Sequence, residues 1–500
     1  MRTTILVVLV GLTAACAVGP GYRRPALGMP DAWRPPAPAA DSLRPFFDSL
    51  RTARDTLLPP GTDTARVPFA YDTTPATAAA DSAALRWVDL VQDSVLRRLV
   101  DTALGDNRDV RTALAVIDEY RAHYRAARGA LLPEVTANGH AGRNRTVFGT
   151  FGSFTYNVYQ ATADLSWELD VWGRIRRGVQ AGRSDLVARE EDRHALQLSL
   201  IGDVATAYFD LRAADLNLAI ARRTLESRRQ TLALARRRLD QGLISELDVR
   251  QFEADVASPA ASVADFERQV AQQENALSVL LGHNPGAIAR GRSLTEMAAR
   301  IPIPAGVPSA LLNQRPDVRS AEASLRAATA RVGVAQAARL PAITITGQYG
   351  SQSTEFSQWF ASGTNIWQTF VGVSIPLFTE GRPGGEQVNV ARAQAAQARS
   401  RYEQTALVAL REVEDALVAL RTAQDRTAAQ ERQAVALRRA LELADMRYQS
   451  GVSSYLEVLD AQRGLFTAEL SLTQAERDQL VAAVQLYRAV GAGWPAAPTP

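Results

Sequence analysis

The feature that most constrains this chain is one long internal duplication. Asn107-Arg-Asp-Val-Arg111 recurs 208 residues later as Arg315-Pro-Asp-Val-Arg319, and the segment Leu239 to Val249 recurs 209 residues later as Tyr448 to Val458. Each copy covers roughly 180 residues, far more than the solenoid repeat units of about 20 to 50 residues. The sequence therefore predicts one large module that is present twice, and not a stack of small units.

Each copy is predicted to contain very long helices. No proline occurs between Pro133 and Pro259, or between Pro383 and Pro495, so nothing interrupts a helix there. A helix from about 174 to 239 would be on the order of 100 Å long. Its apolar residues recur every seven positions, which is coiled-coil periodicity, at Val204, Leu211, Leu218, Leu225, Leu232 and Leu239. The heptads alone are also compatible with an extended coiled-coil scaffold.

Two segments in each copy are predicted to be strands with one apolar and one polar face. Between Tyr159 and Trp167 the odd-numbered residues are apolar and the even-numbered ones are polar, the alternation expected of a strand. We expect strands at about 134–143, 155–169, 341–351 and 366–378, each about ten residues or longer and able to cross a membrane at a tilt. The residues expected to face lipid are Tyr159, Leu165, Trp167, Ile343, Ile345, Trp367, Val371 and Val373.

Four strands cannot close a membrane barrel, because open edges would leave backbone groups unpaired in lipid. Several chains must therefore share one barrel, with a number of strands that is a multiple of four. We expect a fold that is mainly α with a β membrane part, built on a duplicated helix-strand-strand-helix module. Within each copy the expected order is a short helix, two strands, a long helix, a turn and a helix.

Composition excludes several other functions. The 500 residues include 56 basic and 53 acidic side chains, so the net charge is only +3 and we expect no nucleic-acid partner. One cysteine excludes a disulfide framework, and the four histidines lack the spacing of metal ligands. No nucleophile, base or phosphate-loop constellation is present, so we expect no enzyme, no cofactor and no metal. A mean composition this polar is still compatible with a channel, because alternating strands add little apolar content.

The N-terminus is predicted to be an export signal. Residues 1–15 have a basic Arg2, a short apolar run and small residues before Cys16, the layout of a secretory signal peptide. The segment resembles a bacterial lipobox in which Cys16 is acylated, although Thr13 stands where leucine is usual. The alternative is a soluble export signal with an incidental cysteine. We expect a signal peptide at 1–15, a lipidated extended segment at 16–85, repeats at 86–290 and 291–494, and a tail at 495–500.

Two motifs resemble one known family. Cys16-Ala-Val-Gly-Pro-Gly-Tyr-Arg-Arg-Pro25 and the segment Arg447 to Arg463 are similar to the mature start and the tip motif of TolC-like outer-membrane factors of the lipoprotein branch (the OprM and NodT type). The resemblance implies a homotrimer whose 12-stranded barrel in outer-membrane lipid continues as a long α-helical barrel of coiled coils in the periplasm. It also implies a passive exit channel of a tripartite efflux pump for small molecules, with a periplasmic adaptor protein and an inner-membrane RND transporter as partners. A channel for type I protein secretion and a periplasmic coiled-coil adaptor or scaffold lipoprotein remain alternatives.

The turns between the long helices are the candidate functional sites. Gly242 and Gly451 suit the left-handed position after a helix, and Ser245 with Asp248 and Ser454 with Glu457 suit caps that start the next one. The resemblance implies that these turns form the periplasmic tip and contact the adaptor.

A gate is expected just after the second turn. Leu456, Asp460 and Arg463 are spaced i, i+4, i+7 and share one helix face. The resemblance implies a hydrophobic constriction at Leu456, an acid at Asp460 with Arg463 as its basic partner, and an additional acid at Glu457. Exchange of the Asp460–Arg463 pairing would loosen the closure; alternatively, the two form an ordinary solvated pair that contributes little.

Overall fold

The computed structural model describes residues 17–25, 93–147, 149–298, 315–378, 386–450 and 452–491. The predicted signal peptide, Cys16, Gly451, most of the predicted 16–85 segment and the predicted tail lie outside the described residues.

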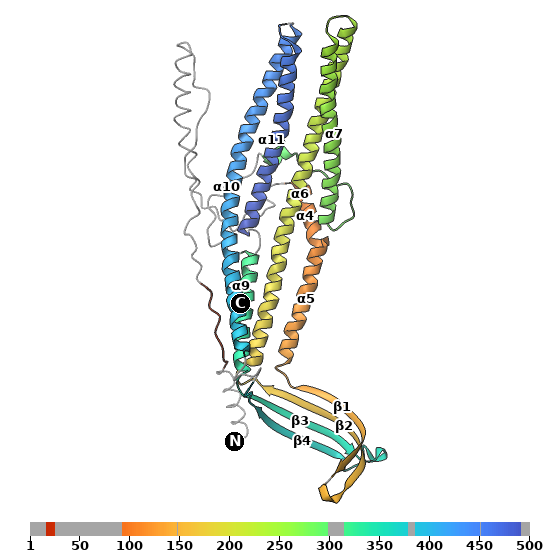
Figure 1. Ribbon diagram of the computed structural model, residues 1–500, viewed down its shortest axis with the longest axis vertical. Coiled ribbons are helices and arrows are strands. Elements are labelled where there is room, and N and C mark those ends of the chain that lie inside the picture. The colour runs from red at the N-terminus through yellow and green to blue at the C-terminus, as the bar shows by residue number, and fades with distance from the viewer. Residues whose placement is uncertain are drawn as a thin grey trace. The chain divides into compact units, whose positions relative to one another are not determined.

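The element order is the predicted one, and it occurs in two copies (Figure 1). A short helix leads into two strands, a long helix, a turn and a second long helix. The first repeat consists of α4 (Ser94–Asp106), α5 (Arg108–Gly129), β1 (Glu134–Val147), β2 (Ser153–Leu169), α6 (Arg174–Asp240) and α7 (Glu246–Leu280). The second consists of α9 (Pro316–Ala337), β3 (Ala342–Ser353), β4 (Asn365–Ser374), α10 (Gln387–Gln449) and α11 (Tyr455–Val490), and the short helix α8 (Leu294–Ala298) lies between the repeats.

The strands and long helices are close to their predicted bounds. Helix α6 spans 67 residues and ends one residue after the predicted end. Strand β1 runs four residues beyond the predicted 143, because its outer part pairs with β2 as far as Val147 opposite Ser153. Strand β4 ends at Ser374 and not at 378, since Pro376 has no N–H to donate to a ladder.

The chain divides into two compact units, and the first contains a four-stranded antiparallel sheet. The strand order is β1-β2-β3-β4, so the two repeats meet where β2 pairs with β3. Odd-numbered residues are paired with odd-numbered ones throughout, as in Leu165 opposite Val135 and Ile345 opposite both Trp167 and Val371. All odd-numbered strand residues therefore share one face of the sheet, and all even-numbered ones share the other.

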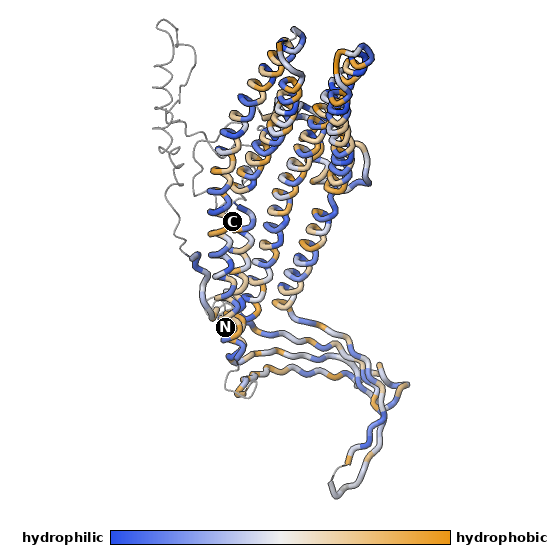
Figure 2. The backbone as a smooth tube through the Cα atoms, turned by 45° about the horizontal axis from the view of Figure 1, so that its top comes forward, coloured by the Kyte–Doolittle hydropathy of each residue, from blue (hydrophilic) through white to orange (hydrophobic). Residues whose placement is uncertain are grey.

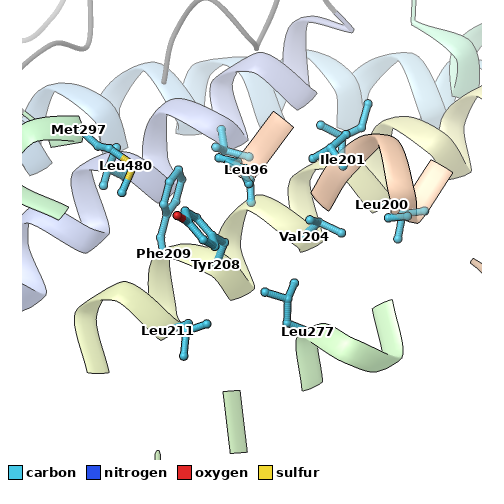
Figure 3. Packing of buried hydrophobic residues seen from close by; sticks show 14 of the residues in the cluster. Leu96, Leu200, Ile201, Val204, Tyr208, Phe209, Leu211, Leu277, Met297 and Leu480 are labelled. Atoms are coloured by element: carbon cyan, nitrogen blue, oxygen red, sulfur yellow. The ribbon is translucent and has the colours of Figure 1, made fainter. Parts of the chain in front are cut away.

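The second unit contains a hydrophobic core built around α6. Val204 and Leu211 of the predicted heptad row are fully buried there, together with the aromatic rings of Tyr208 and Phe209 (Figure 3). Burial of such side chains stabilises a fold by about 1.5–3 kcal/mol each. Leu277 of α7 and Leu480 of α11 complete the cluster, so α6 packs against helices from both repeats.

Hydrophilic and hydrophobic residues are interleaved along the long helices (Figure 2). Within the described residues, no helix combines the length and the apolar character that crossing a bilayer demands.

Candidate functional site

The sheet places all eight residues that were expected to face lipid on its odd-numbered face. Trp367 is 77% exposed, and Val371 and Val373 are also largely exposed in the single chain. Tyr159, Leu165, Trp167, Ile343 and Ile345 are half-buried. Large exposed apolar faces of this kind are typical of surfaces that contact another protein or a membrane. The even-numbered face is mainly polar, apart from Phe370 in the middle of β4 and apolar residues such as Phe154 and Ile366 near the strand ends.

Residues 17–25 lie in the same unit as the sheet. The Val18 N–H donates to the carbonyl oxygen of Trp172, just after β2, at 3.0 Å. The Tyr22 hydroxyl donates to Glu322 on α9 at 2.9 Å, and Arg24 forms an ion pair with the same carboxylate at 3.0 Å. The residues that directly follow Cys16 are therefore fixed beside the helix-side end of the sheet.

The turn between α6 and α7 has the predicted cap geometry. Gly242 adopts φ +72°, and the Leu243 N–H donates to the Arg238 carbonyl at 2.9 Å, as in a Schellman motif. The hydroxyl of Ser245 accepts from the Asp248 N–H, and the Asp248 carboxylate accepts from the Ser245 N–H at 2.9 Å. This is the reciprocal capping box expected from the sequence.

The turn between α10 and α11 ends its first helix as the first turn does, but it begins the next helix differently. The Val452 N–H donates to the Arg447 carbonyl at 3.0 Å, 209 residues after the equivalent bond in the first turn. Ser454 occupies the cap position, yet its side chain makes no cap hydrogen bond, so the predicted capping box with Glu457 is wrong. The Glu457 carboxylate instead pairs with Arg447 across the turn at 3.3 Å, which leaves it unavailable for the cap.

Aromatic rings join the two helical hairpins near these turns. The Phe252 and Tyr455 rings are 4.1 Å apart between centroids, and the Tyr455 and Tyr448 rings are 5.4 Å apart. Arg238 donates to the Tyr448 hydroxyl at 2.6 Å. Burial, and then the nearby carboxylate of Asp255, raise the pKa of Tyr455, so this phenol is neutral at physiological pH. The contacts hold the first-repeat hairpin against the second.

A buried carboxylate, Asp255 on α7, is the centre of the charged network next to those rings. Its Oδ1 accepts from Nη1 of the equally buried Arg228 at 2.8 Å and from Nε of Arg463 at 3.2 Å. Burial lowers the pKa of the Arg228 guanidinium, and the attraction of Asp255 opposes that change. Asp255 Oδ2 and Arg228 Nε have no hydrogen-bond partner among the described residues.

Pro259 explains why this network forms on α7. A proline inside a helix cannot donate to the carbonyl four residues earlier, and here that carbonyl belongs to Asp255. The freed Asp255 carbonyl oxygen accepts instead from Arg228 Nη1 at 2.8 Å. One guanidinium group therefore binds both the side chain and the backbone of Asp255.

The expected gate residues lie together, but their pairing differs from the expectation. Leu456 is 64% exposed, and Asp460 is exposed on the same side of α11. Among the described residues, no ion pair joins Asp460 to Arg463, because the Arg463 guanidinium reaches Asp255 on the neighbouring hairpin. The predicted Asp460–Arg463 pair is therefore not formed within the chain. Arg463 binds the first repeat, and Asp460 projects from the surface of the chain.

Sequence reasoning missed Arg228 and Asp255. The one signal for them was Pro259, four residues after an aspartate within an otherwise helical segment.

Comparison with known proteins gives the family of the chain. The family described as outer membrane efflux protein matches residues 99–283 and 307–492, which correspond to the two structural repeats. A solvent efflux pump outer membrane protein, SrpC of Pseudomonas putida, is 38% identical over 411 residues, covering 81% of this chain and 87% of SrpC. Outer membrane protein OprJ of Pseudomonas aeruginosa is 33% identical over 492 residues, covering 97% of this chain and 95% of OprJ.

Solved structures agree with these sequence matches. The outer-membrane channel OprN superposes with a TM-score of 0.79 at 31% identity, covering 96% of this chain and 100% of OprN. The family consists of outer-membrane efflux channels, and it is not an enzyme family. Because its members are outer-membrane channels, the alternative of a periplasmic adaptor or scaffold is set aside. The protein therefore belongs to the outer membrane efflux protein family and acts as an efflux channel at the outer membrane.

Proposed function

We propose that three copies of this chain form the passive exit duct of a tripartite efflux pump. The observation that carries the proposal is the four-stranded sheet with one apolar and one mainly polar face. Strands β1 and β4 each pair on one side only within the described residues, so both edges are open to a neighbouring copy. Three such sheets would give a closed 12-stranded barrel, with the odd-numbered face toward lipid and the even-numbered face toward water.

The N-terminal segment supports a lipid anchor at the same level. Because Val18 is held beside the end of β2, an acyl chain on Cys16 would start close to the helix-side end of the proposed barrel. Lipidation at Cys16 would then add a second attachment to the outer membrane, next to the strands themselves.

The helical turns form the proposed periplasmic gate. In a trimer, Leu456 and Asp460 of each copy would converge around the axis as an apolar ring and an acidic ring, with Glu457 one position away. Arg463, held to Asp255, keeps the second-repeat hairpin closed against the first. The two turns, with Gly242, Ser245 and Asp248 in the first and Gly451 and Ser454 in the second, would contact the periplasmic adaptor.

The relatives suggest the class of substrate. SrpC is a solvent efflux pump protein, and TtgI of Pseudomonas putida, 38% identical over 411 residues, is a toluene efflux pump protein. We infer small, poorly water-soluble molecules as the cargo, with an inner-membrane RND transporter as the energy source. Those names favour efflux over type I protein secretion.

Planar bilayer recordings test the proposal. Purified protein should run as a heat-sensitive trimer on gels and should insert as discrete conductance steps. Arg463→Ala should increase the size of these steps because it releases the contact with Asp255. Arg439→Ala, which removes an exposed ion pair to Glu442 on α10, is the matched control and should leave the steps unchanged. Protein that remains monomeric and makes no steps would refute the proposal.

A further inference from the structure

A row of polar side chains crosses all four strands on the even-numbered face. Gln368 Nε2 donates to Gln348 Oε1 at 2.8 Å, and Gln348 Nε2 donates to Asp164 Oδ1 at 2.7 Å. From the other side, Asn138 Nδ2 donates to Asp164 Oδ2 at 2.5 Å. Each strand contributes one residue, and we call Asn138, Asp164, Gln348 and Gln368 the polar girdle.

The girdle surrounds its only charge with donors. Both oxygens of the Asp164 carboxylate accept a side-chain amide, and the Thr162 hydroxyl adds a third donor at 3.2 Å. Charge-assisted bonds of this kind fix the orientation of a carboxylate. The backbone ladders are complete without them, and cross-strand pairs add only about 0.2–1 kcal/mol each. Stability alone is therefore a modest reason for a row that spans the whole sheet.

The charges of the strands are distributed unevenly between the two faces. Both strand arginines, Arg143 and Arg145, have odd numbers, whereas the strand acids Glu134, Asp164 and Glu168 have even numbers. Glu168 is neutralised by a two-point contact with Arg174. Glu134 and Asp164 line a hollow of about 350 Å³ on the even-numbered face, together with Ser166 and two girdle residues, Gln348 and Gln368. The face that would line the proposed barrel is thus anionic at this level.

We propose that the polar girdle is a cation-favouring ring inside the barrel, with Asp164 as its charge. The inference rests on the proposed trimeric channel, in which three girdles would join at one level and present three carboxylates to the lumen. Fixed carboxylates around a pore attract cations and repel anions. The solutes favoured are metal cations and amine-bearing molecules, and the solutes hindered are organic acids and other anions.

Thiol labelling from the external medium tests the girdle without passing the periplasmic gate. Ser166→Cys places a probe two residues from Asp164 on the same exposed face, about 7 Å away. Outer membranes are treated with a cationic trimethylammonium-ethyl methanethiosulfonate or with the anionic sulfonatoethyl analogue, and both labelling rates are measured. Their ratio cancels any change in the reactivity of the thiol itself. Protein without Ser166→Cys gives the background from Cys16, the only native cysteine.

The decisive comparison adds Asp164→Asn to the probe. One charge at about 7 Å in water should change the cation-to-anion rate ratio about fivefold in 10 mM salt and hardly at all in 1 M salt. Thr369→Cys on the odd-numbered face is the control and should react with neither reagent. Equal labelling of both faces would overturn the membrane channel itself. If Ser166→Cys is labelled but Asp164→Asn leaves the cation-to-anion rate ratio unchanged, the proposed role of the girdle would be overturned. The same holds if Ser166→Cys reacts with neither reagent.

Discussion

Asp255 binds one buried arginine, Arg228, and one exposed arginine, Arg463, so the loss of each contact should have a different effect on stability. Arg228 and Asp255 are almost completely buried, whereas the Arg463 side chain is 58% exposed. Removing one partner of a buried pair costs about 3–5 kcal/mol, because the remaining charge is stranded away from water. Losing an exposed partner costs about 0–1 kcal/mol. Asp255→Ala should therefore destabilise the protein far more than Arg463→Ala.

The assay is denaturant unfolding of the detergent-solubilised protein, followed by the circular dichroism of its helices. Because oligomer unfolding depends on concentration, all variants are compared at one protein concentration by their midpoints. Both single variants should increase channel conductance, since each removes the Arg463 contact, but only Asp255→Ala should lower the midpoint strongly. Equal midpoints for the two variants would refute the reasoning, because Arg228 would then gain nothing from Asp255.

A double variant separates stability from gating more sharply. At the offset of 209 residues, Leu437 and Gly464 of the second repeat correspond to Arg228 and Asp255. A Cβ atom on Gly464 would lie 3.4 Å from Leu437, so this apolar pair occupies the same place in its own hairpin. Arg228→Leu combined with Asp255→Ala should regain most of the stability lost in Asp255→Ala, because an apolar pair replaces a broken ionic one. Its conductance should remain high, because Arg463 still lacks a partner.

Three further predictions use matched positions and the same unfolding measurement. Ser245→Ala should cost about 1 kcal/mol by loss of its cap, whereas Ser454→Ala should cost little because its hydroxyl caps nothing; equal costs would contradict the assigned caps. Gly242→Ala should destabilise by about 1 kcal/mol through its positive φ, whereas Gly178→Ala in open space on α6 should stabilise slightly; a neutral Gly242→Ala would contradict the turn geometry. Burial raises the pKa of Glu476, and a hydrogen bond from a threonine opposes this change. The contribution of Glu476 to stability is therefore complete below its ordinary pKa of 4.5 and is lost as the pH rises through its pKa in the folded protein. Glu476→Gln should therefore raise the midpoint at pH 7 and not at pH 4, and a pH-independent gain would refute this.

The sequence predicted the elements of this fold because each depends on local pattern. Heptads and the absence of proline defined α6, and odd-even alternation defined β2. The ends of strands were less predictable. Strand β1 is polar and rich in glycine, so its extent depends on pairing with β2 and not on its own residues.

The site was only partly predictable, because its charged partners are far apart in sequence. Asp460 and Arg463 share a helix face, and spacing alone favoured a pair between them. The chosen partner of Arg463 is Asp255, which lies 208 residues earlier and is exposed to it only when the two hairpins pack. The predicted cap at Ser454 is wrong for a local reason, since Arg447 across the turn engages Glu457.

The duplication itself explains why one repeat carries the buried charge. Two copies of the second hairpin would offer no anion to Arg463, because Gly464 stands at the position that corresponds to Asp255. Divergence at one pair of positions, Arg228 and Asp255 against Leu437 and Gly464, leaves one hairpin with an acceptor and the other with an apolar contact. Arg463, directly before Gly464, then reaches across to the only one of the two hairpins that has a carboxylate at this position. The Arg463 contact acts beside the Phe252–Tyr455 rings and the Arg238–Tyr448 hydrogen bond, which also join the hairpins. Because Arg463 is the exposed member of its network, its contact can be released without disturbing the buried pair that stabilises the first hairpin.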